Sequence, residues 1–370
     1  MSEVFALCDE IGPEKVVHIH DHGAGLKAIV VIDNTAAGPA IGGVRMAPDV
    51  TLEECARLAR AMTLKNAAAG LPHGGGKSVI AADPAMPETG KQALIRAFAS
   101  AIAPLTGYIP GPDMGTNETC MAWLRDEIGR AVGLPRVLGG IPLDEIGATG
   151  IGVCVAAEVA AEHAGLKLEG ARVAIQGFGA VGMHAARGLV ARGARLVAVA
   201  DIGGTVQDPE GLSLDALIAL KQEGRSVAAL EGAETAPREA VITADCDIFI
   251  PAARPDAITE ANADRVRARL ILEGANIPAT HEAERRLHAR GVLVVPDFIA
   301  NAGGVICAAV EYHGDSEKDA LEAIEERIGR NTREMLELMD REGLAPREAA
   351  DRLALSRVHA AQALRRSFRA

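Results

Sequence analysis

The sequence of 370 residues is poor in aromatic side chains, which make up only 2% of it. It has no surplus of positive charge either, because its formal net charge at pH 7 is −12. Proteins that bind nucleic acids generally use basic surfaces and stacked aromatic rings, and anionic membranes also attract basic segments. The composition therefore disfavours a nucleic-acid or membrane partner.

Paired cysteines and long apolar runs are also missing. The six cysteines, at positions 8, 55, 120, 154, 246 and 307, form no Cys-x-x-Cys motif, which is typical of reduced thiols. No apolar run reaches the length of a membrane span, and the acidic N-terminal segment lacks the apolar core of a signal peptide. We therefore expect a soluble, cytoplasmic protein.

The chain is long enough for two domains, and its apolar content of 49% and its 40 glycines suit a globular protein. Its first third mixes strands, such as Leu26 to Asp33, with a helix that should begin at the capping box after Thr51 and end near Gly70. From about residue 143, apolar runs alternate with helical or irregular sequence, which predicts a parallel, doubly wound sheet. The predicted strands are residues 172–177, 195–201, 247–251, 270–273 and 292–296.

Two lysines stand out within the first third. On the capped helix Lys65 shares an apolar face with Met62 and Ala69, where a lysine either snorkels to solvent or turns inward to an anion. Lys77 follows three consecutive glycines, which allow close approach of backbone or ligand. The spacing thus permits an anion pocket shared by both ammonium groups.

A glycine-rich motif follows the first strand of the second domain. The run Gly177-Phe178-Gly179-Ala180-Val181-Gly182 reads G-x-G-x-x-G, which allows a pyrophosphate to approach a helix N-terminus. Asp201 ends the next predicted strand, where an acidic residue binds ribose hydroxyls and repels a 2′-phosphate. We favour a dinucleotide site over a merely glycine-rich turn, and NAD over NADP, although small polar residues nearby would still admit NADP.

Two other polar groups have competing interpretations. Asp113 lies in a Gly/Pro-rich loop, and its spacing alone favours a turn aspartate over a carboxylate that exchanges a proton with Lys77. His18, His20 and His22 would share one side of a strand, as metal ligands do. No distant Cys/His pattern accompanies them, so we favour a solvated strand face and predict no metal.

Several blocks in the expected order resemble the glutamate/leucine/phenylalanine/valine dehydrogenases, which oxidatively deaminate amino acids. The resemblance runs from about Gly25 to the C-terminal helices. It implies a substrate-binding and oligomerisation domain at 1–142, an NAD-binding Rossmann domain at 143–334, and C-terminal helices (335–370) that pack back on the first domain. The matching blocks are residues 38–46 (GPAIGGVRM), 71–77 (LPHGGGK), 111–117 (GPDMGTN), 273–276 (EGAN) and 296–304 (PDFIANAGG).

The resemblance also implies a division of roles. Lys77 would activate the water that attacks the imine carbon, Asp113 would shuttle the proton to and from nitrogen, and Lys65 would bind the substrate α-carboxylate. The remaining substrate-binding residues would be Ile41, Gly42, Gly43, Met62, Asn276, Val305 and Ala308. The cofactor site would combine the glycine motif and Asp201 with Thr149, Ala252, Asn276 and Asn301.

Two departures from the family pattern bear on the substrate. Ile41 stands where glutamate-specific members usually have lysine, and Ala308 where they usually have serine. An apolar pocket would bury a side-chain carboxylate unpaired, at a cost of several kcal/mol. We therefore expect a neutral, apolar L-amino acid of the Leu/Val/Ile/Phe type, as in the leucine/phenylalanine/valine branch.

Two alternatives remain open. One is a glutamate dehydrogenase with an atypical side-chain pocket, and the other is a catalytically silent, dinucleotide-sensing paralogue. In either case we expect a homo-oligomer, whose stoichiometry the sequence does not specify.

Overall fold

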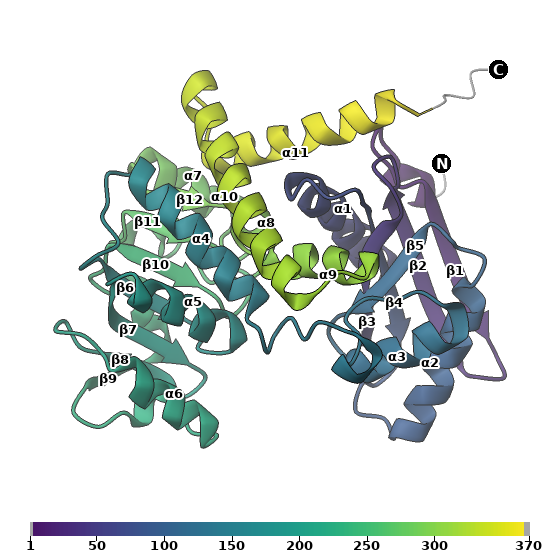
Figure 1. Cartoon of the computed structure of the whole chain (residues 1–370), viewed down its shortest axis with the longest axis horizontal. Coiled ribbons are helices and arrows are strands. Elements are labelled where there is room, and N and C mark those ends of the chain that lie inside the picture. The colour runs from purple at the N-terminus through teal and green to yellow at the C-terminus, as the bar shows by residue number, and fades with distance from the viewer. Residues whose placement is uncertain (1–2, 366–370) are drawn as a thin grey trace. The chain divides into compact units, whose positions relative to one another are not determined.

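The computed structural model describes residues 3–365, which divide into two compact units (Figure 1). Unit 1 contains the chain up to Pro142, Val305–Ala320 and the residues from Ala354 onward. Unit 2 contains Leu143–Gly304 and Leu321–Leu353. The first boundary coincides with the change of pattern near residue 143. At the C-terminal end, residues 335–370 were expected to join the first domain. Instead, Leu321–Leu353 groups with unit 2, whereas Val305–Ala320 and the residues from Ala354 onward group with unit 1.

Unit 1 is built on a mixed five-stranded sheet with the order β1-β2-β4-β3-β5. β2 pairs antiparallel with β1 and β4, whereas β3 runs parallel to β4 and β5. Helix α1 packs on one face, and α2 and α3 contribute to the apolar cluster on the other. The elements are β1 (Lys15–Asp21), β2 (Leu26–Asn34), β3 (Ala40–Ala47), α1 (Leu52–Ala68), β4 (Gly74–Ala81), α2 (Glu88–Ile102), β5 (Tyr108–Pro112) and α3 (Glu118–Ile128), with short 3-10 helices η1 (Glu3–Leu7) and η2 (Arg136–Leu138).

Helix α1 begins as the sequence predicts, because the Thr51 hydroxyl accepts a hydrogen bond of 3.1 Å from the backbone N–H of Glu54. Its most buried face differs from the apolar face that the sequence predicts, although Ala69 of that face is buried (1% exposed). Cys55, Ala59 and Thr63 are buried, whereas Met62 and Lys65 are half-buried. The reason is the glycine backbone of β4, since a Cβ on Gly75 would lie 2.0 Å from the backbone nitrogen of Thr63.

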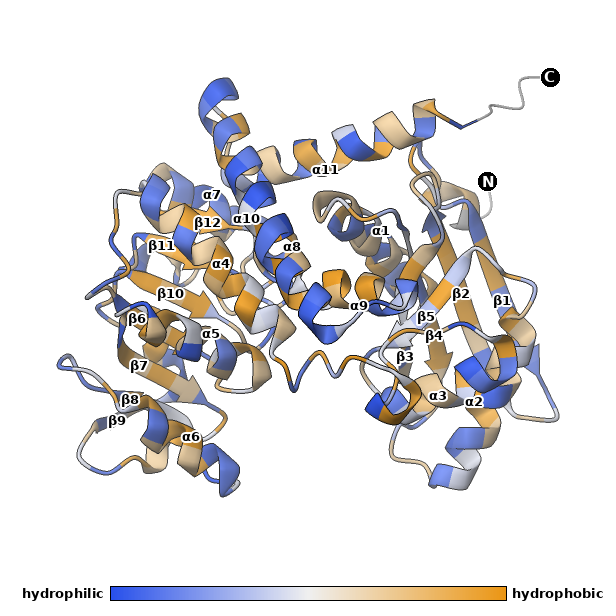
Figure 2. Cartoon of the chain, viewed as in Figure 1, coloured by the Kyte–Doolittle hydropathy of each residue, from blue (hydrophilic) through white to orange (hydrophobic). Residues whose placement is uncertain are grey.

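Unit 2 contains a seven-stranded sheet with the order β12-β11-β10-β6-β7-β8-β9. The first five strands are parallel and match the five predicted runs, whereas β8 and β9 add an unpredicted antiparallel edge. Figure 2 shows β7 and β10 as mainly hydrophobic, in agreement with their burial. The strands are β6 (Arg172–Gln176), β7 (Arg195–Asp201), β8 (Gly204–Gln207), β9 (Glu234–Ala236), β10 (Ile248–Pro251), β11 (Leu270–Leu272) and β12 (Leu293–Val295).

Helices precede, connect and follow these strands and complete the doubly wound fold. They are α4 (Ala148–His163), α5 (Ala180–Ala191), α6 (Leu214–Gln222), α7 (His281–Ala289) and α8 (Asp297–Ala300), with 3-10 helices η3 (Val227–Ala229), η4 (Arg238–Thr243) and η5 (Ala263–Arg265). Within residues 3–365, no helix combines the length and apolar character that a bilayer crossing requires.

Three further helices form the C-terminal part of the chain: α9 (Gly303–His313), α10 (Glu317–Glu342) and α11 (Pro346–Ala363). α10 ends at Glu342 and α11 begins at Pro346, so the chain breaks between them at a segment that starts with Gly343. Within unit 1, Glu311 of α9 is buried, and its carboxylate accepts hydrogen bonds from the backbone N–H groups of Leu134 (3.1 Å) and Ile141 (2.9 Å). A late segment of the chain therefore satisfies backbone groups of the early one.

Candidate active site

The site in unit 1 lies where β4, β3 and β5 run side by side. Their glycines leave no space for larger residues: a Cβ on Gly42 would lie 1.6 Å from the carbonyl oxygen of Gly76, and one on Gly74 would lie 1.8 Å from that of Asn34. These glycines thus permit close packing of the backbone around Lys77, which lies on β4. Lys77 is 7% exposed.

Lys77 forms an ion pair with the carboxylate of Asp113, which follows β5 directly. Gly43 of β3 lies between them, because a Cβ there would be 2.8 Å from the Cβ of Asp113 and 3.1 Å from the Lys77 Nζ. The parallel pairing of Gly43 with Gly111 sets this arrangement. The structure thus brings together the two residues that spacing alone did not connect.

Arg45 is a third charged group at this site, and it was not among the site residues predicted from the sequence. Its Nε lies 3.4 Å from the Asp113 Oδ2, and its Nη1 lies 2.5 Å from the Glu54 Oε1. Burial raises the pKa of Asp113, but Lys77 and then Arg45 outweigh burial, so this pKa is lowered from its usual value. The alternation of side chains along a strand could have revealed Arg45, because Arg45 is two residues beyond Gly43 and therefore lies on the same face of the sheet.

The predicted substrate-binding residues come mainly from three elements of unit 1. Ile41 (3% exposed) is two residues before Gly43 on β3, so it shares the face of Lys77 and Asp113. Met62 and Lys65 are half-buried on α1, Val305 is half-buried on α9, and Ala308 is 9% exposed one helical turn later. Asn276 differs from the others, because it is exposed and belongs to unit 2.

The glycine motif in unit 2 has the strand–turn–helix context that a dinucleotide site requires. Gly177 has φ +93°, and a Cβ there would lie 2.8 Å from the Ala252 carbonyl carbon. A Cβ on Gly182 would lie 2.0 Å from the Gly177 oxygen, which keeps α5 close to the strand. At Gly179, the N-cap of α5, a Cβ would meet no atom of the described chain within 4 Å. Open space at a helix N-terminus fits a pyrophosphate.

The other residues of the motif differ in what they can offer. Phe178 is 1% exposed, so its ring belongs to the core and only its backbone can serve a ligand. Ala180 and Val181 are half-buried in the first turn of α5 and carry no polar side-chain atom. Backbone amides, rather than side chains, are therefore the binding groups that this turn provides.

Asp201 ends β7 as predicted, but it does not present a free carboxylate. Its Oδ2 accepts from Lys221 Nζ (2.8 Å) and the Val227 N–H (3.0 Å), and its Oδ1 accepts from Ser226 Oγ (2.6 Å) and the Gly203 N–H (2.9 Å). Burial raises its pKa, while these hydrogen bonds outweigh burial and lower it. The negative charge that was expected to exclude a 2′-phosphate is thus partly neutralised by Lys221, which lies 20 residues further along the chain and gave no local signal.

Three predicted cofactor residues lie near the α8–α9 turn of unit 2. The Asn301 Nδ2 donates to the Asn276 Oδ1 (3.1 Å) and to the Ala275 carbonyl (3.1 Å). Thr149, the second residue of α4, has its Oγ1 3.3 Å from the position that a Cβ on Gly304 would occupy. The structure therefore connects Asn276 to Asn301 and places Thr149 beside the same turn.

The remaining candidates are not assembled into a site. His18 and His20 are on β1, and His22 lies just after it. In the part of the chain that the structure describes, no group of three or more His, Cys, Asp or Glu side chains is placed to hold a metal ion. Cys8 is exposed and the other five cysteines are buried, each as a free thiol.

Comparisons with known proteins cover nearly the whole chain. Residues 139–366 match the family described as Glutamate/Leucine/Phenylalanine/Valine dehydrogenase, and residues 13–130 match the Glu/Leu/Phe/Val dehydrogenase, dimerisation domain. The NADP(+)-dependent glutamate dehydrogenase of Pyrobaculum calidifontis is 42% identical over 75% of this chain and 70% of its own length. The NAD-specific glutamate dehydrogenase of Staphylococcus aureus is 39% identical over 82% of this chain and 76% of its own.

Solved structures give the same result. The hetero-hexameric glutamate dehydrogenase of Thermus thermophilus in its Leu bound form has a TM-score of 0.84 at 34% identity, covering 96% of this chain and 91% of that chain. The L-tryptophan dehydrogenase of Nostoc punctiforme has a TM-score of 0.77 at 27% identity, covering 97% and 99%. The similarity therefore includes both units.

Proposed function

Because the chain belongs to the Glutamate/Leucine/Phenylalanine/Valine dehydrogenase family, we propose that it catalyses the reversible oxidative deamination of an L-amino acid to a 2-oxo acid and ammonium. The observation that carries this proposal is the buried contact between Lys77 and Asp113, whose side chains are 8% and 17% exposed. An ammonium and a carboxylate in contact, shielded from water, form a pair that can pass a proton. A structural protein would not require such a pair on a glycine-lined surface.

The two residues take complementary roles. Lys77 activates the water that attacks the imine carbon, and Asp113 carries the proton to and from the nitrogen. Lys65 binds the substrate α-carboxylate, which is supported by its half-buried position in the last turn of α1. Arg45 adds a second cation beside Asp113 and favours its ionised form.

The cofactor proposed is NAD, held by the backbone of Gly177–Gly182 with Thr149, Ala252 and Asn301 nearby. When bound, it supplies the hydride acceptor for the oxidation. The relatives of this chain include NAD-specific and NADP-dependent enzymes. The acidic Asp201 supports NAD, but its contact with Lys221 (2.8 Å) reduces the repulsion that a 2′-phosphate would meet.

For the side chain of the substrate, the relatives favour glutamate over the neutral side chain that the sequence analysis favoured, since both relatives compared by sequence carry the name glutamate dehydrogenase. We therefore place glutamate first. In that case, a group other than residue 41 or residue 308 must pair with the side-chain carboxylate, because Ile41 and Ala308 have no polar side-chain atoms to offer.

A neutral, apolar amino acid is the second candidate. It is supported by the burial of Ile41 (3% exposed) on the same face as the Lys77–Asp113 pair, and by Ala308. Buried apolar surface rewards an apolar side chain by roughly 25 cal/mol per Å². The structural relative named for tryptophan also supports it, since that protein has this fold and a neutral substrate by its name.

A panel assay separates these possibilities. NADH consumption is measured with ammonium and a series of 2-oxo acids, which includes 2-oxoglutarate, 4-methyl-2-oxopentanoate and phenylpyruvate. Turnover of 2-oxoglutarate alone would establish glutamate and refute the apolar pocket. Turnover of the branched or aromatic acids alone would establish the second candidate. If none reacts while NADH still binds, the protein is a dinucleotide-sensing paralogue rather than an enzyme.

A homo-oligomer is part of the same proposal. It is supported by the match of residues 13–130 to a dimerisation domain. Light scattering coupled to size exclusion gives the stoichiometry, and a monomer at assay concentration would contradict it.

A further inference from the structure

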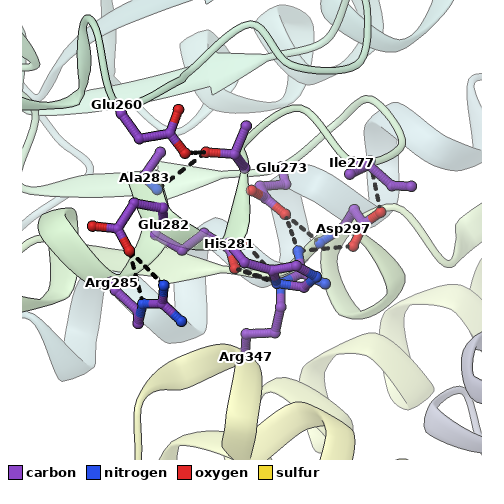
Figure 3. Close-up of polar contacts among 11 residues, drawn as sticks. Glu260, Glu273, Ile277, His281, Glu282, Ala283, Arg285, Asp297 and Arg347 are labelled. Carbon is purple, nitrogen blue, oxygen red and sulfur yellow. Dashed lines mark hydrogen bonds and ion pairs between the residues drawn. The ribbon is translucent and has the colours of Figure 1, made fainter.

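Arg347, near the N-terminal end of α11, is surrounded by three carboxylates of unit 2 (Figure 3). Its Nη2 lies 2.8 Å from the Glu273 Oε2 and 3.2 Å from the Asp297 Oδ1, and its Nε donates to Glu284 (2.6 Å). The three acids come from different elements: Glu273 follows β11, Glu284 lies on α7 and Asp297 begins α8. One guanidinium thus connects three separate parts of the nucleotide-binding unit.

These groups are almost completely removed from water. The side chain of Glu273 is 0% exposed, and those of Glu284, Asp297 and Arg347 are 8%, 10% and 15% exposed. Burial, Glu284 and Asp297 all raise the pKa of Glu273, whereas Arg347 lowers it, and the result is a pKa well above the usual value. Removing the guanidinium would leave several buried acids without this cation, so its contacts must hold this region together.

The cluster connects to Ile277, the residue after Asn276, through two hydrogen bonds. The Asp297 backbone N–H donates to the Glu273 Oε2 (2.9 Å), and the Asp297 Oδ2 accepts from the Ile277 N–H (2.8 Å). Ile277 follows Asn276 directly and has φ +49°, a left-handed conformation that a β-branched residue adopts only when its surroundings impose it. The Asp297 carboxylate holds the N–H of Ile277, and the Asp256 N–H donates to the Ile277 carbonyl (3.0 Å).

The same short helix also holds the side chain of Asn276. Asn301, the C-cap of α8, donates its N–H to the Asp297 carbonyl (2.7 Å) and its Nδ2 to the Asn276 Oδ1 (3.1 Å). Asp297 therefore fixes the backbone after Asn276, while Asn301 fixes its amide. Asn276 lies in an irregular segment between β11 and α7, so it has few other means of keeping one conformation.

We propose that Arg347 is a positioning residue for the amino acid dehydrogenase reaction, which holds Asp297 and thereby the conformation of Asn276. The inference rests on the proposed function, since it takes Asn276 as a ligand-binding residue. Arg347 itself is not among the residues proposed to bind substrate or cofactor. It acts through the Asp297–Ile277 hydrogen bond.

The test compares Arg347→Lys with a matched control, Arg285→Lys. Both arginines pair with a glutamate of α7, but Arg285 is 71% exposed and contacts Glu282 at the surface (Figure 3). A lysine keeps the charge but lacks the planar fork that reaches two or three carboxylates. We expect Arg347→Lys to lower kcat/KM for the 2-oxo acid by about 10- to 100-fold, because misplacing a binding group by about 1 Å can cost that much. Arg285→Lys should stay within about twofold of the unmodified protein, as for surface pairs generally.

A double-mutant cycle separates positioning from general stabilisation. If Arg347 acts through Asn276, the variant Arg347→Lys/Asn276→Ala should be no slower than Asn276→Ala alone. Independent losses that multiply, or an Asn276→Ala variant as active as the unmodified protein, would overturn the inference. Should Arg347→Lys fail to fold, as judged by circular dichroism, Asp297→Asn takes its place in the cycle with the same expectation.

The outcome also separates this inference from the proposed function. An unmodified protein that turns over none of the 2-oxo acids would refute the function, and with it the inference. An active protein in which Arg347→Lys and Arg285→Lys behave alike would refute only the inference.

Discussion

Ile41→Lys is the substitution that most directly tests how the side chain of the substrate is selected. Ile41 lies on β3, two residues before Gly43, whose Cβ position is 3.1 Å from the Lys77 Nζ. Residues two apart on a strand are roughly 7 Å apart and point to the same face. A lysine at position 41 would therefore place its ammonium on the face that carries the Lys77–Asp113 pair, at a distance suited to the far end of a substrate side chain.

The expected magnitude follows from the interaction gained. A hydrogen bond to a charged group contributes about 1.5–3 kcal/mol, and each ~1.4 kcal/mol is a factor of ten in rate. The ratio of kcat/KM for 2-oxoglutarate to that for 4-methyl-2-oxopentanoate should rise by about 10- to 150-fold. The same substitution should lower the Tm, because position 41 is only 3% exposed and burial penalises the ammonium.

The assay is steady-state NADH oxidation with both 2-oxo acids in the unmodified protein, Ile41→Lys and Ile41→Met. Methionine conserves the apolar character and approximate volume, so its ratio should change little. If Ile41→Lys leaves the ratio unchanged while the protein remains folded, residue 41 does not line the side-chain pocket. The argument for a neutral substrate would then be wrong.

Charged residues elsewhere provide three shorter tests. Lys77→Ala should abolish turnover but leave the NADH dissociation constant nearly unchanged, because the nucleotide motif belongs to the other unit; equal loss of both in a fluorescence titration would mean that Lys77 is structural. Lys221→Met should increase the preference for NAD over NADP by about tenfold, or ~1.4 kcal/mol, because Asp201 would lose its cation; an unchanged ratio of kcat/KM for the two cofactors would contradict this. The pKa of Asp113 is lowered in the folded protein. Its ionised form therefore stabilises the fold at pH values above the unfolded-state pKa of about 3.9. This stabilisation is lost as the pH falls through the folded-state pKa. Asp113→Asn should therefore weaken the acid-induced decrease in the free energy of unfolding below about pH 4, and an unaltered decrease in urea denaturation would refute it.

The parallel strands of unit 2 were predictable because each is a short, continuous apolar run that ends at a turn. β8 and β9 were not, since Gly204–Gln207 and Glu234–Ala236 are short and β9 is largely exposed. Period and burial carry the sequence signal, and the edge strand β9, with three largely exposed residues, has little of either. The end of α10 and the start of α11 were predictable for the opposite reason, because Gly343 and Pro346 are strong helix-breaking signals.

The sequence predicted most residues of the candidate site, but it did not predict which of their side chains contact one another. Nothing between positions 77 and 113 indicates that the side chains meet, because the contact depends on the order β4-β3-β5, in which a strand earlier in the chain separates two later ones. The partners of Asp201 could not be predicted from the sequence either. Lys221 lies on a helix and Ser226 follows that helix, so both reach Asp201 only through the tertiary fold. In the sequence Arg347 is one of many charged residues on an amphipathic helix, and nothing there indicates its contacts with three acids.

The carboxylate of Glu311 has a consequence for how the protein is made. It accepts the backbone N–H groups of Leu134 and Ile141, although it is synthesised only after the whole of Leu143–Gly304. At about 5–20 residues per second on the ribosome, the roughly 170 residues that separate Ile141 from Glu311 take about 8 to 34 s to synthesise. During that interval the N–H groups of Leu134 and Ile141 can bond only to water, and unit 2 also lacks its later segment, Leu321–Leu353. A nascent chain therefore completes unit 1 late, even though the sheet of that unit is synthesised first.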